Sequence, residues 1–362
     1  MAARSDRLGP EELAALGSCP APRGDHEQIV LGHGSGGRLS AELLHRVFLP
    51  AFENEVLGRL EDAATCPLEM SEGGRLAFTT DAFVVQPLFF PGGDIGRLAI
   101  VGTVNDLAVA GAMPRHVSAA FILEEGLPVT TLERIVASMR ATCAEAGVTL
   151  VCGDTKVVDR GKGDGVFITT SGVGVVPRGR ALSVASARPG DRVLVSGTLG
   201  DHGIAVLSVR EGLDFETSLV SDCAPLVDLA RALLDACPGA RCMRDPTRGG
   251  LASALTEIAT ASRVGVRLEE AALPLRPEVR AACEVLGLDP LYVASEGKLV
   301  AVVPPADAAR ALAALRGHPR GRDAALVGEV IAEDPGVVMM RSIFGSDRLV
   351  TLLQGEQLPR IC

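Results

Sequence analysis

One stretch, GRLAIVGTVNDLAVAGA at residues 96–112, is apolar on nearly every side when it is drawn as a helix. A helix with a single apolar face can lie on a surface, whereas a helix that is apolar all round has to be buried. Strand patterns precede it at residues 76–85 and follow it at residues 148–158 and 165–177. We therefore predict a buried central helix in a fold that mixes helices with antiparallel-looking strands, which is the α+β class.

The rest of the chain divides into two cycles of strands and helices. An amphipathic helix is expected at residues 130–147, where Gly147 ends it, and a short strand, a turn and a helix at residues 28–52. A polar segment rich in proline and glycine, residues 177–191, separates the cycles. The predicted units are a flexible extension (1–28), an N-terminal domain (29–183), a C-terminal α+β domain (184–345) and a mobile tail (346–362).

The charge of the chain excludes some classes of partner. The 362 residues carry a formal net charge of −10, whereas nucleic acids and anionic membranes require basic surfaces. The chain also has one tyrosine and no tryptophan, so it lacks most of the side chains that stack on bases. We expect small molecules and proteins as partners, with no nucleic acid and no membrane.

The cysteines and the N-terminus bear on location. The nine cysteines form no CxxC pair, and their odd number is typical of a reduced protein rather than of a disulfide scaffold. The first 25 residues have no apolar core of signal-peptide length, and no apolar run is as long as a membrane-spanning helix. The terminal cysteine, Cys362, does not fit the prenylation pattern. These features predict a cytoplasmic protein.

Four aspartates, Asp81, Asp106, Asp154 and Asp245, lie where apolar segments end or are interrupted, each beside Gly, Thr or Asn. One such aspartate is usually a cap or turn residue. Four of them fit a shared carboxylate cluster better, and Mg²⁺ with a nucleotide needs one or two carboxylates besides phosphate oxygens and water. The sequence therefore indicates a site for a magnesium–nucleotide complex.

Glycine-rich turns and isolated charges add weaker signals. HGSGGR, at residues 33–38, joins a strand to a helix, where backbone N–H groups favour phosphate, although it is not a P-loop and such turns are common without ligands. Arg248 lies beside another such turn, and Lys156 could neutralise a transferred phosphoryl group or be a solvated strand-end charge. His202 could cap its turn or act in catalysis, and Glu296 could be a surface residue.

Several motifs occur in a fixed order: HGSGG, TTDAFVVQPLFFPGGDIGRLAIVGTVNDLAVAGA, GDTKVV, GDHG, DPTRGGLA, SEGKL and the terminal PRIC. Together they resemble the aminoimidazole ribonucleotide synthetase-like superfamily of ATP-using enzymes. Within it they are most similar to the HypE family, the carbamoyl dehydratases of nickel–iron hydrogenase maturation. The terminal PRIC is the most specific part of this resemblance, which extends from about residue 29 to the end of the chain.

The resemblance implies a two-domain fold in which the N-terminal domain forms a homodimer through β-strands, with an ATP site between the domains. It implies that Asp81, Asp106 and Asp154 hold Mg²⁺ and that Lys156 lies at the phosphates. The residues that it assigns to the bound nucleotide are His33, Gly34, Gly36, Gly37, Asp81, Asn105, Asp106, Asp154, Thr155, Asp245 and Arg248. Asp245 and Glu296 would lie near the reacting end.

The resemblance also gives the terminal thiol a role. A partner carbamoyltransferase would load Cys362 with a carbamoyl group, and ATP would activate its oxygen so that loss of phosphate leaves a thiocyanate. An iron-carrying scaffold complex would then accept the cyanide. A flexible tail of nine residues could span roughly 30 Å between these sites. Glu296 is the candidate general base and His202 the reserve. A small-molecule kinase of the same superfamily and a non-enzymatic thiol carrier are the alternatives.

Overall fold

The computed structural model describes residues 37–43, 45, 59–61, 64–67, 74–212, 219–353, 358 and 360–362. The predicted extension, the strand expected at residues 28–31 and three residues of the predicted glycine loop, His33, Gly34 and Gly36, lie outside this part of the chain. Within it, a search of the helices finds none that is long and apolar enough to cross a membrane.

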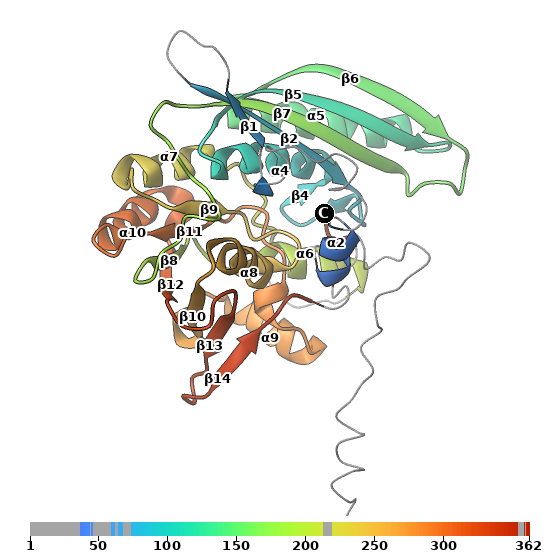
Figure 1. Ribbon diagram of the computed structural model, residues 1–362. Coiled ribbons are helices and arrows are strands. Elements are labelled where there is room, and N and C mark those ends of the chain that lie inside the picture. Colours follow the sequence, from blue (N-terminus) through green and yellow to red (C-terminus); the bar gives the residue numbers. More distant parts are fainter. Residues whose placement is uncertain are drawn as a thin grey trace, which may run out of the picture.

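The first half of the described chain is built on a five-stranded sheet in the order β1-β2-β7-β5-β6. All neighbouring strands pair antiparallel except β5 and β6, which are parallel. Helices α4 and α5 pack on one face of this sheet (Figure 1). The elements of this half are α2 (Arg38–Leu43), β1 (Ala64–Pro67), β2 (Arg75–Phe83), β3 (Phe89–Phe90), β4 (Gly93–Asp94), α4 (Ile95–Val109), β5 (Met113–Glu124), α5 (Val129–Ala146), β6 (Thr149–Val158) and β7 (Val166–Val176).

The second half is built on a seven-stranded sheet in the order β14-β13-β10-β12-β8-β11-β9, where only β10 and β13 pair parallel. Its strands are β8 (Arg192–Val195), β9 (Cys242–Arg244), β10 (Gly265–Glu269), β11 (Val300–Val303), β12 (Ala325–Ile331), β13 (Val338–Arg341) and β14 (Asp347–Val350). Its helices are α6 (Asp201–Arg210), α7 (Val227–Ala236), α8 (Gly250–Ser262), α9 (Pro277–Leu286) and α10 (Ala308–Gly317), with short 3₁₀ turns at Glu270–Ala272, Pro290–Tyr292 and Pro319–Gly321.

Helix α4 accounts for the apolar segment at residues 96–112. One side of the helix packs on strands β2 and β7 and on helix α5, and another side contacts α7 and β9 of the second half. Its N-terminus is capped by Asp94, whose carboxylate accepts hydrogen bonds from the N–H groups of Gly96 and Arg97. The prediction of a buried helix is confirmed, and the helix lies between the two halves of the chain.

The other predicted elements agree with the structure where it describes them. Helix α5 ends where expected, and Gly147 caps it in the left-handed conformation with φ 69°. Of the helix expected within residues 28–52, the part from Arg38 to Leu43 is helical, and most of the remainder lies outside the described residues. Within the predicted tail, Asp347–Val350 form β14 and pair with β13.

The face of the first sheet opposite α4 carries exposed apolar side chains. Phe78 is 45% exposed, Ile122 42% and Val84 37%. Edge strand β6 is exposed along nearly its whole length and includes Val151 and Val157. An exposed apolar edge strand is a template for pairing with another chain. We name this face, together with β6, the outer face.

Candidate functional site

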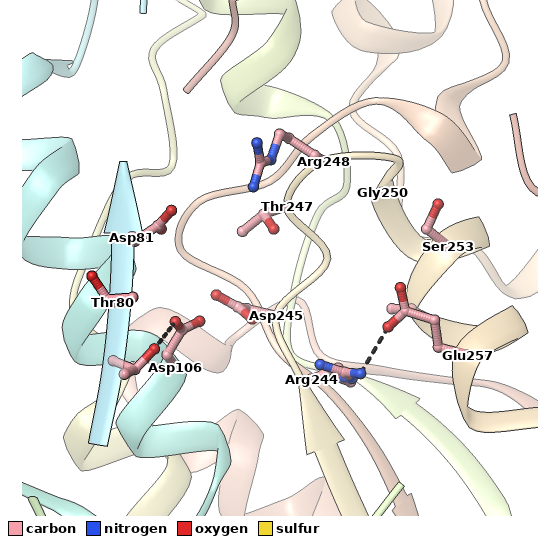
Figure 2. Close-up of a pocket in the computed structure, with 12 residues that line it drawn as sticks. Thr80, Asp81, Asp106, Arg244, Asp245, Thr247, Arg248, Gly250, Ser253 and Glu257 are labelled. Atoms are coloured by element: carbon pink, nitrogen blue, oxygen red, sulfur yellow. Dashed lines mark hydrogen bonds and ion pairs between the residues drawn. The ribbon is translucent and has the colours of Figure 1, made fainter. Parts of the chain in front are cut away.

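A polar pocket of about 270 Å³ lies where β2 and α4 of the first half meet the segment between β9 and α8 of the second. Figure 2 shows the side chains of Asp81, Asp106 and Asp245, from three different elements, around one space with Arg248 at its edge. The residues that line the pocket are Thr79, Thr80, Asp81, Asp106, Arg244, Asp245, Thr247, Arg248, Gly250, Ser253, Ala254 and Glu257. Three of the four predicted aspartates therefore come together here.

Helix α4 and strand β2 approach closely at the pocket. A Cβ atom added to Gly102 would lie 3.2 Å from Oδ2 of Asp81, so the glycine leaves room for this carboxylate. Asp106 lies one helical turn further along α4, and its Oδ2 accepts a hydrogen bond from the hydroxyl of Thr79 at 2.7 Å. The carboxylate of Asp81 thus reaches the pocket from strand β2, and that of Asp106 reaches it from helix α4, which packs against this strand.

The glycine pair in DPTRGG shapes the opposite wall. Gly249 and Gly250 have φ values of 77° and 60°, which side-chain-bearing residues rarely adopt. A Cβ at Gly250 would also lie 2.4 Å from the carbonyl oxygen of Leu291. These two positions therefore require glycine, and the turn they make brings Asp245 and Arg248 to the pocket just before α8 begins.

Burial raises the pKa values of the pocket carboxyls, and neighbouring negative charge adds to this at Asp106 and Asp245. Burial is the main cause for Asp81, although Arg248 acts in the opposite direction. Burial, followed by the charges of Asp245 and Asp81, holds the pKa of Asp106 well above its usual range. Burial raises the pKa of Asp245 to about 6. Such a site stabilises bound cations, because a cation relieves repulsion among the carboxylates.

Replacing Asp245 with asparagine should stabilise the ligand-free chain at pH 8. The pKa of Asp245 is raised from 3.8 to about 6, so its contribution to stability is complete below pH 4 and is lost as the pH rises through about 6. We expect a gain of about 1–2 kcal/mol at pH 8, reduced from the full shift because the pocket is open to water. Thermal unfolding at pH 5 and pH 8 measures it.

The pH dependence separates this effect from a general change in packing. The stability difference between Asp245→Asn and the wild type should be clearly smaller at pH 5 than at pH 8. Asp323→Asn, which changes an exposed carboxylate away from the pocket, is the matched control and should show no such difference. An equal gain at both pH values would contradict the assignment.

Glu296 lies behind the pocket and is only 2% exposed. Burial, followed by the charges of Asp245, Asp81 and Asp222, holds its pKa well above the usual range. Within the described residues its Oε1 has no hydrogen-bond partner. The surface alternative for Glu296 is therefore wrong, because the side chain is buried among other carboxylates.

Asn105 is buried and acts as a bridge between the two halves of the chain. Its amide nitrogen donates to the carbonyl oxygens of Ala224 and Glu296, each at 3.2 Å, and its amide oxygen accepts from the N–H of Leu226 at 2.8 Å. It does not line the pocket. Gly37, at the start of α2, is buried and also lies outside the pocket lining.

Asp154, Thr155 and Lys156 lie away from the pocket. The Lys156 ammonium pairs with Asp154 at 2.7 Å, and their side chains are 72% and 65% exposed. Asp154 on β6 pairs in register with Ala120 on β5. Asp81 on β2 pairs with Thr170 on β7, and Thr170 pairs in turn with Ala119 on β5, which faces inward.

This register puts Asp154 and Lys156 on the outer face and Asp81 on the face that packs against α4. Strands β2 and β6 are also three positions apart in the sheet, roughly 14 Å. One chain alone therefore does not bring Asp154 together with Asp81 and Asp106.

The tip of the C-terminal tail lies beside the pocket. The N–H of Val84, three residues after Asp81 on the same strand segment, donates to a main-chain oxygen of Cys362 at 3.2 Å. The negative charge at Cys362 is the largest of the influences that raise the pKa of Arg248, so the two residues interact electrostatically. Ile361 is 4% exposed and packs into the core of the first half.

His202 does not line the pocket but contacts the tail. Its ring is fully buried, Nε2 lies 2.8 Å from the carbonyl oxygen of Ile361, and Nδ1 lies 2.8 Å from the hydroxyl of Ser221. Burial lowers the pKa of His202. Both ring nitrogens are therefore engaged, and neither faces the pocket.

Several residues at the site were not among the sequence candidates. Thr79, Arg244 and Thr247 are part of TTDAF and RDPTRGG, so those motifs could have yielded them. Glu257, which pairs with Arg244 at 2.8 Å across the pocket wall, had no signal in the sequence. The same is true of Asp222, whose carboxylate accepts from the N–H of Glu296 and pairs with Lys298 at 3.4 Å.

A search of the described residues finds no group of three His, Cys, Asp or Glu side chains arranged to hold a metal ion. The pocket fits Mg²⁺ nevertheless, because this ion takes one or two carboxylates and completes its shell with phosphate oxygens and water. Asp81 and Asp106 provide two half-buried carboxyls whose pKa values are raised mainly by burial, and the charge of Asp81 raises that of Asp106 further.

Two sequence profiles match the chain. The N-terminal domain of AIR synthase related proteins matches residues 60–176, and the C-terminal domain of the same proteins matches residues 188–341. A carbamoyl dehydratase HypE from Cupriavidus necator is 57% identical over 335 residues, which are 92% of this chain and 95% of the relative.

Solved structures of similar proteins have the same fold. The HypE subunit of a HypE–HypF complex is 47% identical with a TM-score of 0.81, over 86% of this chain and 99% of that one. The hydrogenase maturation protein HypE in complex with ATP is 48% identical with a TM-score of 0.77, over 92% of this chain and all of that one. The predicted mixed two-domain architecture is thereby confirmed.

Proposed function

The chain belongs to the HypE carbamoyl dehydratases, a family within the AIR synthase related proteins, and we propose that it dehydrates a carbamoyl group carried on its own Cys362. As a member of this family it is an ATP-using enzyme of hydrogenase maturation. The observation that supports the use of Cys362 is its main-chain hydrogen bond with Val84 and its electrostatic interaction with Arg248 at the edge of the carboxylate pocket. The terminal thiol thus lies beside the proposed nucleotide site.

The proposed reaction converts –S–C(=O)–NH₂ into –S–C≡N. The amide oxygen attacks the γ-phosphorus of ATP and ADP leaves. The nitrogen then loses two protons and the phosphate departs with the former carbonyl oxygen. The products are a thiocyanate, ADP and phosphate. Because phosphoryl transfer depends mostly on positioning and on neutralising charge, Arg248 and Lys156 are the cations that we assign to it.

We assign the proton transfer to Glu296. A buried carboxyl with a raised pKa is a stronger base than an exposed one, and its free Oε1 can accept a proton from the amide nitrogen. His202, the reserve candidate, has both ring nitrogens engaged away from the pocket. We therefore assign His202 to holding the tail rather than to the chemistry.

Asp81 and Asp106 would hold Mg²⁺, with Asp154 as a further ligand, and Asp245 would face the reacting end. When bound, the ion would supply positive charge that neutralises the charge developing on the phosphoryl group during transfer. We propose, on the strength of the motif, that the triphosphate is bound by the backbone N–H groups of the loop that contains His33, Gly34, Gly36 and Gly37.

We propose a homodimer in which the outer faces of two copies pack together. The exposed apolar side chains of this face and the unpaired edge of β6 support it, because water-exposed strands of this kind are normally covered. In such a dimer Asp154 and Lys156 of one copy would face the pocket of the other, which would complete the predicted ligand set. Asn105 and Thr155 would support the ligand residues from either side of the dimer interface.

Two partner proteins follow from the proposed chemistry. A HypF-type carbamoyltransferase would load the thiol, in line with the HypE–HypF complex among the similar structures. An iron-carrying scaffold complex would accept the cyanide. Seven of the cysteines, Cys143, Cys152, Cys223, Cys237, Cys242, Cys283 and Cys362, are free thiols, which supports a reducing, cytoplasmic location.

We also retain the proposed division of the chain at residues 183 and 184. The two family profiles leave residues 177–187 between them, which supports a boundary in this segment. Residues 346–362 would then be the arm that carries the thiol, and residues 1–28 a separate extension.

The mass of the intact protein tests the proposed function. The wild type is incubated with a HypF-type carbamoyltransferase, carbamoyl phosphate and Mg-ATP. An adduct on Cys362 that loses the mass of one water only when ATP is present would support the dehydratase. A stable carbamoyl adduct would point to a thiol carrier instead. Failure to form any adduct with an active transferase would favour a small-molecule kinase.

A further inference from the structure

The last three residues of the chain are held mainly through their backbone. The main-chain oxygens of Arg360, Ile361 and Cys362 each accept at least one hydrogen bond from the body of the protein. The donors are the N–H groups of Val84 and Gln86 and the side chains of His202 and Arg210. The distances are 3.2 Å to Cys362, 2.8 Å to Ile361, and 3.1 and 2.6 Å to Arg360.

A chain of hydrogen bonds fixes the protonation of His202. The N–H of Cys223 donates to the hydroxyl of Ser221 at 3.1 Å, so this hydroxyl is free to donate to Nδ1 of His202. The carbonyl oxygen of Ile361 can only accept, so Nε2 carries the hydrogen. The buried ring is therefore neutral and is oriented to donate to the tail.

Arg210, near the end of α6, joins the tail to the segment after β2. Its Nε and Nη2 atoms donate to the carbonyl oxygen of Gln86 at 2.9 and 2.6 Å, and Nη2 also donates to that of Arg360 at 2.6 Å. Arg360 has a φ of 54°, in the left-handed region, and its side chain pairs with Asp164 in the turn between β6 and β7. A non-glycine residue keeps this conformation only when its surroundings hold it.

We propose that His202, Arg210 and Asp164 form a tail clamp, a set of positioning residues that controls how often Cys362 is docked at the pocket. This inference rests on the proposed function, because it supposes that the thiol leaves the pocket for loading and returns for dehydration. Arg210 and His202 bind carbonyl oxygens, and Asp164 binds the side chain of Arg360. All three contacts are therefore the same whether the sulfur is free, carbamoylated or cyanated.

The clamp predicts opposite effects on two steps. A weakened clamp leaves Cys362 undocked for more of the time, so the thiol becomes more accessible to a loading enzyme and to alkylating reagents. Dehydration requires the docked state, so its rate falls by the same factor as the docked fraction. A residue that merely stabilised the fold would not separate the two steps.

The test uses the full chain with Arg210→Gln and, as a second variant, Asp164→Asn. Alkylation of Cys362 by iodoacetamide is followed by peptide mass, with added glutathione as the reference thiol. We expect Cys362 to react about fivefold to tenfold faster in both variants. Arg210→Lys, which keeps one charge but loses the planar fork, should fall between Arg210→Gln and the wild type. Arg231→Gln removes an exposed arginine from α7 and should have no effect.

Single-turnover dehydration of preloaded chains provides the second readout. The rate should fall about fivefold in Arg210→Gln, whereas loading by the carbamoyltransferase should be equal or faster. An unchanged alkylation rate in both variants would overturn the clamp. Alkylation involves neither ATP nor carbamoyl transfer, so a wild type that never forms thiocyanate would refute the proposed function while the clamp was still tested.

Discussion

Replacing Cys362 with alanine should abolish cyanide formation and leave the binding of Mg-ATP intact. The sulfur is the atom that we assign to carry the carbamoyl group, so no other side chain at the tip can replace it. The docking contact of residue 362 is made by its main-chain oxygen with the N–H of Val84, and alanine retains this oxygen. We expect turnover to fall by about 1,000-fold or more and the ATP affinity to stay within about threefold. Product mass and calorimetric titration measure the two quantities.

The control for this experiment is Cys152→Ala. Cys152 lies on β6 and is exposed in a single chain, so this variant reports whether a carbamoyl adduct forms at a thiol other than Cys362. This variant should still accumulate the adduct on Cys362. If Cys362→Ala lost its affinity for ATP, the thiol would be part of the nucleotide site and the idea of a carrier arm would be wrong.

Much of the fold can be predicted from local patterns in the sequence. The helix at Ile95–Val109 follows from an apolar surface with no polar face, and α5 follows from its helical period and the glycine that ends it. Strand β6 shows the limit of this approach. Its apolar residues resemble those of a buried strand, yet it is an exposed edge. A strand pattern does not reveal whether the covering surface belongs to the same chain or to a second copy.

The candidate site was predictable in its residue types but not in its grouping. Asp81, Asp106 and Asp245 converge as expected, because each ends or interrupts an apolar element at one junction. Asp154 differs because the register between β5 and β6 shifts between Val117 and Ser118, and a shift of one residue exchanges the two faces of a strand. Such a register shift depends on tertiary packing, which the sequence pattern does not specify.

Replacing Lys156 with alanine should leave Cys362 able to accept the carbamoyl group but stop its dehydration. We assign the ammonium group to the transferred phosphoryl, so its loss should lower the single-turnover rate by about 100-fold or more. The fold should hardly change, because Lys156 and its partner Asp154 are exposed in a single chain. Lys162→Ala, in the turn after β6, is a matched control of the same residue type. A variant that still made thiocyanate at the normal rate would remove Lys156 from the mechanism.

Mixed dimers would decide whether Lys156 serves its own pocket or that of a second copy. In an equal mixture of inactive Lys156→Ala and inactive Asp81→Asn chains, about half of the dimers are mixed. If Lys156 acts across the interface, each mixed dimer has one pocket with both native residues, so total activity returns to about a quarter of the wild type. If Lys156 acts within its own chain, every pocket lacks one residue and the mixture stays inactive. The opposite orientations of Asp81 and Lys156 in the sheet favour recovery, and the activity of coexpressed chains, purified together without separating the dimers, measures it.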